Sequence, residues 1–322
     1  MDNSPVLYIV VPCYCEQETL PGSNAALCEL LGQMVKANEV SADSRLVYVD
    51  DGSSDATWQL ISRFAGESPM VCGVKLSRNF GHQNAIVAGM ETMLQEGDIF
   101  ITIDADLQDD IAAIPQMVVK YKEGYEIVYG VRSSRETDTW FKRTTAQGFY
   151  KLMNRLGVES VYNHADFRLM DRRTVTELLR YPERNLFVRG IVPLLGFKST
   201  TVEYERKKRT AGVTKYSLSK MIGFAVDGIT SFSSQPVRMV FNLGLIFLVI
   251  AFGILVYVLY SKLSGHAVSG WSSMILSLWF VGGCILMGLG IVGEYIGKIY
   301  AEVKARPRYH VDQITPPTPN EK

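Results

Sequence analysis

Short apolar runs rich in β-branched side chains recur between Val6 and Gly130. Runs of this kind are typical of strands buried on both faces of a sheet. The predicted strands are Leu7–Val11, Leu46–Val49, Val71–Leu76, Ile99–Ile103 and Ile127–Tyr129. Helical patterns lie between them at Thr19–Ala37, Ala56–Phe64, Gln83–Leu94 and Ile111–Lys122. This alternation predicts an α/β sheet with helices on both faces and ligands at the carboxyl ends of the strands.

The pattern becomes less regular between Thr139 and Ser234, where aromatic and basic residues mix with apolar ones, as in Trp140–Arg143. We expect the rest of the catalytic domain here, together with amphipathic helices that lie at a membrane surface. Ordinary amphipathic surface helices of a globular protein fit the same pattern, and the sequence leaves both readings open.

Two long segments without a charged residue follow, Met239–Tyr260 and Trp271–Val292. Each has the roughly 20 apolar residues that a membrane-spanning helix needs. Lysine and arginine flank the pair on both outer sides, whereas the connecting loop has one lysine, so the positive-inside rule places both flanks in the cytoplasm. The expected organisation is a cytosolic catalytic domain at 1–234, a two-helix transmembrane region at 235–300 and a cytosolic tail at 301–322.

Composition narrows the class of function. Lys+Arg and Asp+Glu both number 33, and this balance argues against a nucleic-acid binder that relies on overall positive charge. The five cysteines include one Cys-x-Cys and no second close pair, so we expect reduced thiols and no zinc site. The N-terminal residues lack an apolar signal segment, which agrees with a catalytic domain and both termini in the cytoplasm of a multi-pass inner-membrane protein.

Asp104 and Asp106 directly follow a predicted buried strand. In extended chain, residues i and i+2 point the same way, so the two carboxylates are expected to converge at the mouth of the sheet. Oxygen ligands of this kind suit Mg²⁺ or Mn²⁺, which often share them with substrate phosphates. A solvated acidic loop is the alternative for an Asp-x-Asp pair taken alone.

Two more polar motifs follow strands. The loop Asp50–Asp55 has paired acids that could hold a ribose or a base, or could simply connect a strand to a capped helix. Pro12 is expected to end the first strand, and Tyr14 and Glu16 to lie at the same crevice. The dinucleotide fingerprint and the P-loop are both missing from the sequence, which disfavours a dinucleotide oxidoreductase and a P-loop ATPase.

These motifs together resemble a known family, the A-type glycosyltransferases of family 2. They are Val-Pro-x-Tyr at Val11–Tyr14, Asp-Asp-Gly-Ser-x-Asp at Asp50–Asp55, Arg-Asn-Phe-Gly at Arg78–Gly81, Asp-Ala-Asp-Leu-Gln at Asp104–Gln108 and Asp-Phe-Arg-Leu at Asp166–Leu169. Nearly the whole chain, including both apolar segments and the ending Arg306–Tyr309, is similar to the polyprenyl-phosphate glycosyltransferases. These include bactoprenol glucosyltransferases, the undecaprenyl-phosphate formamido-arabinose transferase and dolichol-phosphate mannose synthases. The resemblance implies a Rossmann-like GT-A catalytic domain.

The resemblance also implies roles for individual residues. Pro12, Tyr14 and Glu16 would line the nucleobase pocket, and Asp51 would contact the uridine. Asp104 and Asp106 would hold the metal that bridges the donor diphosphate. Asp166 and Asp106 are the candidate catalytic residues, with Asp166 near the acceptor as a base or an orienting group. A basic stretch would bind the phosphates of donor and lipid, with Arg206 on the donor and Arg209, Lys215 and Tyr216 on the acceptor. The same stretch could equally attract anionic lipid headgroups.

Two departures from the family are visible. Cys15 stands where the family usually has Asn in its first motif, which puts details of base contact in doubt. The Gln-x-x-Arg-Trp motif of processive synthases has only a partial match at Gln235–Met239, without the Trp, and this favours a single transfer.

The expected reaction is an inverting transfer of a sugar from a nucleotide donor to undecaprenyl or another polyprenyl phosphate, with Mg²⁺ or Mn²⁺. UDP-glucose is the first choice of donor, and UDP-GlcNAc, UDP-formamido-arabinose and GDP-mannose remain open. Rival functions are a processive polysaccharide synthase, a nucleotide-sugar-binding scaffold without turnover, and a channel for lipid-linked sugars. A homo-oligomer is expected, because two spans alone enclose little.

Overall fold

The computed structural model describes residues 4–132, 164–184, 188–205, 235–264 and 270–315. One unit is built around an eight-stranded sheet with the strand order β7-β5-β6-β4-β1-β2-β3-β8. The strands are β1 (Leu7–Cys13), β2 (Arg45–Asp50), β3 (Val71–Leu76), β4 (Ile99–Thr102), β5 (Ile127–Arg132), β6 (His164–Asp171), β7 (Ser199–Tyr204) and β8 (Val311–Thr315). All five strands predicted from apolar runs are present, which confirms the α/β class.

The sheet is mixed rather than uniformly parallel. Strands β1 to β4 pair in parallel, as expected from their helical crossovers. β6 inserts antiparallel between β4 and β5, and β7 then pairs in parallel with β5. The insertion brings a late segment of the chain to the middle of the sheet, beside the strand that carries the Asp-x-Asp pair.

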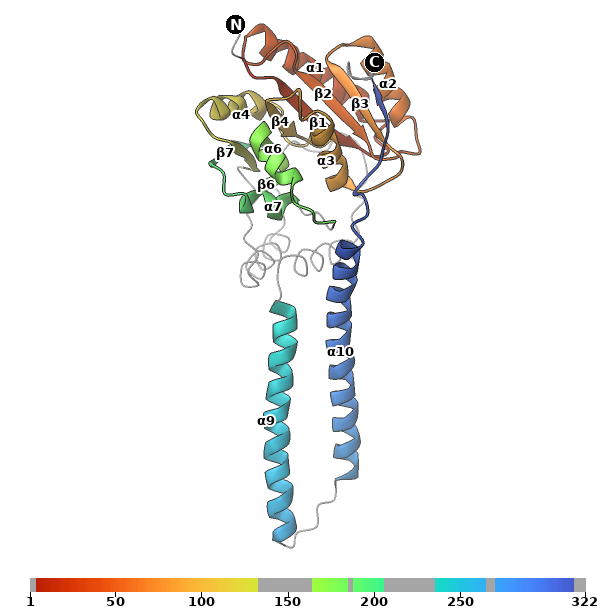
Figure 1. Ribbon diagram of the computed structural model, residues 1–322, viewed down its shortest axis with the longest axis vertical. Helices are drawn as coiled ribbons and strands as arrows, with labels where there is room; N and C mark the ends of the chain where they lie inside the picture. Colours follow the sequence, from red (N-terminus) through yellow and green to blue (C-terminus); the bar gives the residue numbers. More distant parts are fainter. Residues whose placement is uncertain (1–3, 133–163, 185–187, 206–234, 265–269, 316–322) are drawn as a thin grey trace. The chain divides into compact units, whose positions relative to one another are not determined.

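Helices cover both faces of this sheet (Figure 1). They are α1 (Leu20–Lys36), α2 (Thr57–Glu67), α3 (His82–Thr92), α4 (Ala113–Lys122), α6 (Arg172–Leu179) and α7 (Val188–Leu194). Apolar side chains of α1, α2 and α4 join the main core cluster, which includes Leu7, Ile9 and Val11 of β1. α3 and α6 pack on the other face. A Cβ at Gly89 of α3 would come within 2.6 Å of the Val10 side chain, so glycine allows α3 to lie close to β1.

Part of the segment expected to be a separate tail, residues 301–322, belongs to the catalytic unit. β8 pairs antiparallel with β3 and covers an edge that would otherwise be open. Ion pairing between Lys75 and Asp312, at 3.5 Å, and a hydrogen bond from the Tyr309 hydroxyl to Glu91 fix this segment. Charged and polar residues make up most of β8, so the local sequence pattern does not predict a strand here. The strand forms by pairing with β3, which is distant in the sequence.

A second unit contains the two long helices α9 (Gln235–Leu263) and α10 (Trp271–Val303). They contact each other through an edge-to-face pair of Phe247 and Phe280, whose ring centroids lie 5.6 Å apart. Within the described residues, one segment, Phe280–Val303, is long and apolar enough to cross a membrane. The predicted helices are therefore present, whereas two membrane crossings remain a prediction. The interface helices predicted between residues 139 and 234 fall mostly outside the described residues.

Candidate active site

Asp104 and Asp106 lie just beyond the carboxyl end of β4, as the sequence predicts. The Asp104 side chain is 48% exposed. The Asp106 carboxylate accepts a hydrogen bond from the backbone N–H of Gln108 at 3.3 Å, which holds the turn after the strand. The following residue, Leu107, has a φ of +43°, so the chain reverses sharply here. The turn leaves a carboxylate at the mouth of the sheet.

Asp166 reaches the same place from β6. Thr102 pairs with Arg168 in the antiparallel register, and two residues further this register brings Asp104 level with Asp166. The Thr102 hydroxyl donates to the Asp166 carbonyl and fixes the strand end. His82, the first residue of α3, has its Nε2 atom 3.5 Å from Asp104 and 3.3 Å from Asp166. Three elements therefore meet around one histidine.

The Asp166 carboxylate is surrounded by donors. Its Oδ1 accepts from Arg168 at 2.7 Å and from Arg189 Nε at 2.9 Å. Its Oδ2 accepts from a second Arg189 nitrogen at 2.8 Å and from the Gln83 amide at 3.3 Å. Burial alone raises an acid's pKa, but His82 and the two guanidinium groups outweigh it and hold the pKa of Asp166 well below its usual range. Asp166 is thus an ionised anchor, poorly suited to accept a proton.

Asp104 has the opposite electrostatic character. Desolvation, together with the negative charges of Asp166, Asp109 and Asp106, raises the pKa of Asp104 to about 6, although His82 acts in the other direction. Burial lowers the pKa of His82, but the carboxylates of Asp166 and Asp104 outweigh burial and raise it. A carboxylate that lacks enough positive charge around it is a natural ligand for a cation.

The loop after β2 holds the Arg78–Gly81 segment in place through hydrogen bonds to Asp51. Asp51 is buried, and its two oxygens accept hydrogen bonds from the backbone N–H groups of Phe80 and Gly81 at 2.7 and 2.9 Å. Burial raises the pKa of Asp51 even though these two bonds lower it. Gly52 has a φ of +68°, and a Cβ there would lie 2.4 Å from the Arg78 backbone. The motifs at Asp50–Asp55 and Arg78–Gly81 therefore form one packed unit, and the uridine contact of Asp51 remains a proposal.

The first motif differs from the expectation at one point. β1 continues through Pro12 to Cys13, and Pro12 pairs with Val49. The proline is tolerated because β4 pairs with β1 only as far as Val10, so β1 has a single neighbour at Pro12. Tyr14 beyond it is 48% exposed, and Glu16 accepts a hydrogen bond from Thr19 at 2.7 Å. The tyrosine ring is thus available at the carboxyl end of the sheet.

The backbone conformation at Cys15 explains why the family usually has Asn at this position. Its φ of +55° is in the left-handed region, which Asn adopts more readily than other residues with a Cβ. We expect Cys15→Asn to stabilise the protein by about 0.5–1 kcal/mol, because Asn lowers the backbone strain. The measurement is the melting temperature of the purified protein. Cys15→Ser is the control, since it removes the thiol without the left-handed preference; equal stabilisation by both variants would contradict the explanation.

Several site residues were missed by sequence reasoning. These are His82, Gln83, Arg168 and Arg189, which all contact Asp166. His82 and Gln83 directly follow the Arg78–Gly81 motif, and Arg168 lies inside the motif that begins at Asp166, so adjacency was an available signal. The predicted phosphate-binding residues lie outside the described residues, namely Arg206, Arg209, Lys215 and Tyr216.

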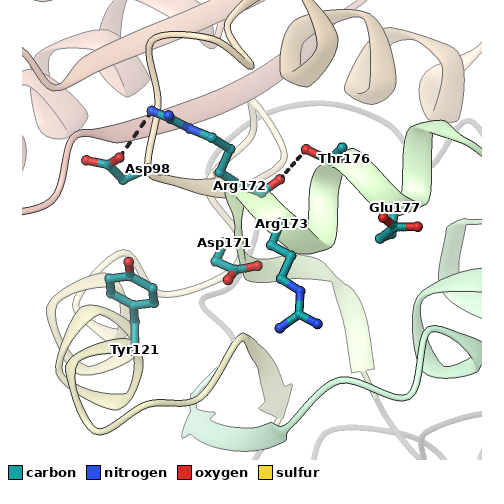
Figure 2. Close-up of a pocket in the computed structure, with 7 residues that line it drawn as sticks. All are labelled: Asp98, Tyr121, Asp171, Arg172, Arg173, Thr176 and Glu177. Atoms are coloured by element: carbon teal, nitrogen blue, oxygen red, sulfur yellow. Dashed lines mark hydrogen bonds and ion pairs between the residues drawn. The ribbon is translucent and has the colours of Figure 1, made fainter.

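A hollow of about 410 Å³ lies beside the amino-terminal end of β4, and Figure 2 shows the residues that line it. Asp98, which precedes β4, and Asp171, which ends β6, are among its lining residues. Its charged groups are paired, with Arg172 at 3.1 Å from Asp98 and Arg173 at 3.1 Å from Glu126. Because Asp98 precedes β4 and Asp104 follows it, the hollow is separate from the carboxylates at the carboxyl end of β4.

Known proteins resemble this chain over most of its length. Residues 8–179 match the sequence profile of Glycosyl transferase family 2. The uncharacterized glycosyltransferase YkoT of Bacillus subtilis is 53% identical over 96% of this chain and 92% of its own length. The SfII prophage-derived bactoprenol glucosyl transferase of Shigella flexneri is 40% identical over 94% of this chain and 96% of its own. A prophage bactoprenol glucosyl transferase homolog of Escherichia coli is 39% identical over 95% and 98%.

Proposed function

The chain belongs to glycosyltransferase family 2 and is a glycosyltransferase. We propose that it transfers a sugar from a nucleotide donor to a polyprenyl phosphate. The observation that carries the proposal is the meeting of Asp104 and Asp166 around His82 at the carboxyl ends of the strands. The names of the bactoprenol glucosyl transferases that resemble it over most of their length support a lipid acceptor.

The chemistry needs orientation more than strong base catalysis. An oxygen of the acceptor phosphate, already anionic near neutral pH, attacks the anomeric carbon. The bond from that carbon to the donor diphosphate breaks, and the nucleoside diphosphate leaves with the bonding electrons. Attack opposite to the leaving group inverts the configuration. The saturated, ionised Asp166 fits an orienting role and not a proton-accepting one.

The carboxylates at the mouth of the sheet fit a divalent cation. Asp104 and Asp106 would hold Mg²⁺ or Mn²⁺, which neutralises charge on the departing diphosphate when it is bound. Among the described residues, no cluster of three or more His, Cys, Asp or Glu forms a complete cage. A site with one or two carboxylates is usual for an ion that shares its coordination with substrate phosphates.

Membrane attachment is part of the proposal. Large apolar side chains along α9 and α10 are exposed, including Phe241, Phe252, Leu278 and Leu286, each at about 70%. Exposure of this extent along two helices suits a lipid environment. We propose that both helices span the cytoplasmic membrane, with the catalytic unit and both termini in the cytoplasm, as the charge distribution predicts.

The donor and the number of transfers belong to the proposal as well. UDP-glucose is the preferred donor, in keeping with the bactoprenol glucosyl transferases; UDP-GlcNAc, UDP-formamido-arabinose and GDP-mannose are the alternatives. The partial match at Gln235–Met239 favours one transfer over a processive synthase. Assembly into a homo-oligomer also remains a proposal.

The test is direct. Detergent-purified protein is incubated with undecaprenyl phosphate, Mg²⁺ or Mn²⁺ and a panel of labelled nucleotide sugars, and label is measured in the organic phase. We expect one donor to label the lipid with a single sugar and Asp104→Asn to abolish the signal. Nucleotide binding without any labelled lipid would contradict the proposal and favour a binding scaffold, and a labelled polymer would favour a processive synthase.

A further inference from the structure

Two arginines share Asp166, but their surroundings differ greatly. Arg168 belongs to β6, and its side chain is buried at 1% exposure. The Arg189 side chain is 43% exposed, although two of its nitrogens bond the same carboxylate. Arg168 alone is sufficient to neutralise Asp166. Asp166 and the two arginines together carry one net positive charge.

The backbone beside Arg189 is held in place. Val188 donates its N–H to the Gln83 side chain at 3.2 Å, and Gln83 donates in turn to Asp166 at 3.3 Å. One residue of α3 thus links the start of α7 to the Asp166 carboxylate. Arg189 approaches Asp166 with two parallel bonds, a geometry that fixes the plane of the guanidinium. A fixed, half-exposed guanidinium is prepared to bind an anion at little entropic cost.

The position of this guanidinium suggests which anion it binds. His82 contacts Asp104 at 3.5 Å and Asp166 Oδ2 at 3.3 Å, and Arg189 contacts the same Oδ2 at 2.8 Å. His82 and Asp166 thus connect Arg189 to Asp104. The donor diphosphate belongs at Asp104, where a cation would neutralise it. A second phosphate placed at Arg189 would therefore be close to the donor without occupying the diphosphate site.

We propose that Arg189 binds the phosphate of the lipid acceptor and that Asp166, through its two bonds to Arg189, positions it for attack on the sugar. This inference rests on the proposed function, since it takes the acceptor to be a phosphomonoester. It assigns Arg189 as a substrate-contacting residue and Asp166 as a positioning residue.

The experiment compares Arg189→Gln and Arg189→Lys with the unchanged protein. The readouts are the KM for undecaprenyl phosphate, the Kd for the donor nucleotide without lipid, and the melting temperature. We expect Arg189→Gln to raise the acceptor KM about ten- to a hundredfold, the usual effect of losing a charged hydrogen bond, with little change in nucleotide Kd. Lys retains the charge but not the paired geometry, so its effect should be intermediate.

Arg180→Gln is the matched control. Arg180 is an exposed arginine directly after α6 that pairs with Glu177 at 3.0 Å, and its loss should alter none of the three values. The inference is overturned if Arg189→Gln weakens nucleotide binding and leaves the acceptor KM unchanged. It is equally overturned if only the melting temperature falls, because that result means that Arg189 is structural. A failure of the proposed function is distinct: the unchanged protein would then label no lipid at all.

Discussion

Asp104→Asn is expected to reduce the rate of sugar transfer at least about a hundredfold while leaving the protein folded. The loss follows from the role proposed for this carboxylate, since stabilising the departing diphosphate contributes several kcal/mol to such reactions. The fold should survive because Asp104 is half-exposed and its charge is repelled by Asp166, Asp109 and Asp106, so losing that charge removes little that holds the structure. His82 loses one partner but keeps Asp166 at 3.3 Å.

The measurement combines initial rates at saturating Mg²⁺ with the melting temperature. Asp43→Asn is the control for the same chemical change. Asp43 is exposed and lies in the loop before β2, at the amino-terminal end of the strand, whereas Asp104 follows the carboxyl end of β4. We expect the control to keep its full rate and Asp104→Asn to keep its melting temperature or gain slightly. A variant that retains more than about a tenth of the rate would mean that Asp104 does not hold the metal.

The first half of the sheet was predictable because its signals are local. Val71–Leu76 matches β3 at both ends, and the run Ile99–Ile103 differs from β4 by one residue. Buried parallel strands need continuous apolar runs, and the short loops after them place polar motifs at one edge. Asp104 and Asp106 could therefore be located at the mouth of the sheet from their position after a strand.

The second half depends on contacts that no local pattern records. β6 contains Asp166 and Arg168, two charged residues that look like surface positions in the sequence but are 5% and 1% exposed. Their burial is possible because they neutralise each other at 2.7 Å. Arg189, which completes the group, comes from a helix more than twenty residues later in the chain. Pairing over such distances is visible only in the folded protein.

Asp166→Asn is expected to destabilise the catalytic unit by about 3–5 kcal/mol, the usual consequence of removing one partner of a buried ion pair. Asn has nearly the same shape as Asp, so the loss is electrostatic and no cavity forms. It leaves the Arg168 guanidinium buried without its carboxylate. The comparison with Arg189→Gln is informative, since removing Arg189 leaves the Asp166–Arg168 pair intact, and that variant should remain folded.

The measurement is the urea midpoint of the full chain in detergent, read from hydrogen exchange of the β6 amides. Glu177→Gln is the control, because it breaks an exposed ion pair with Arg180 and should cost at most about 1 kcal/mol. The pKa of Asp166 is depressed in the fold, so its stabilisation is complete above the unfolded value near about 4 and is lost as pH falls through the folded value. Because Asp166 also raises the pKa of His82, the difference between the unchanged protein and Asp166→Asn should grow as His82 becomes charged between about pH 8 and about pH 6. Below about pH 5 it should narrow as Asp166 itself is protonated. A difference that instead continued to grow below about pH 5 would contradict the depressed pKa of Asp166, and Arg189 would then lack the anionic anchor that its proposed role requires.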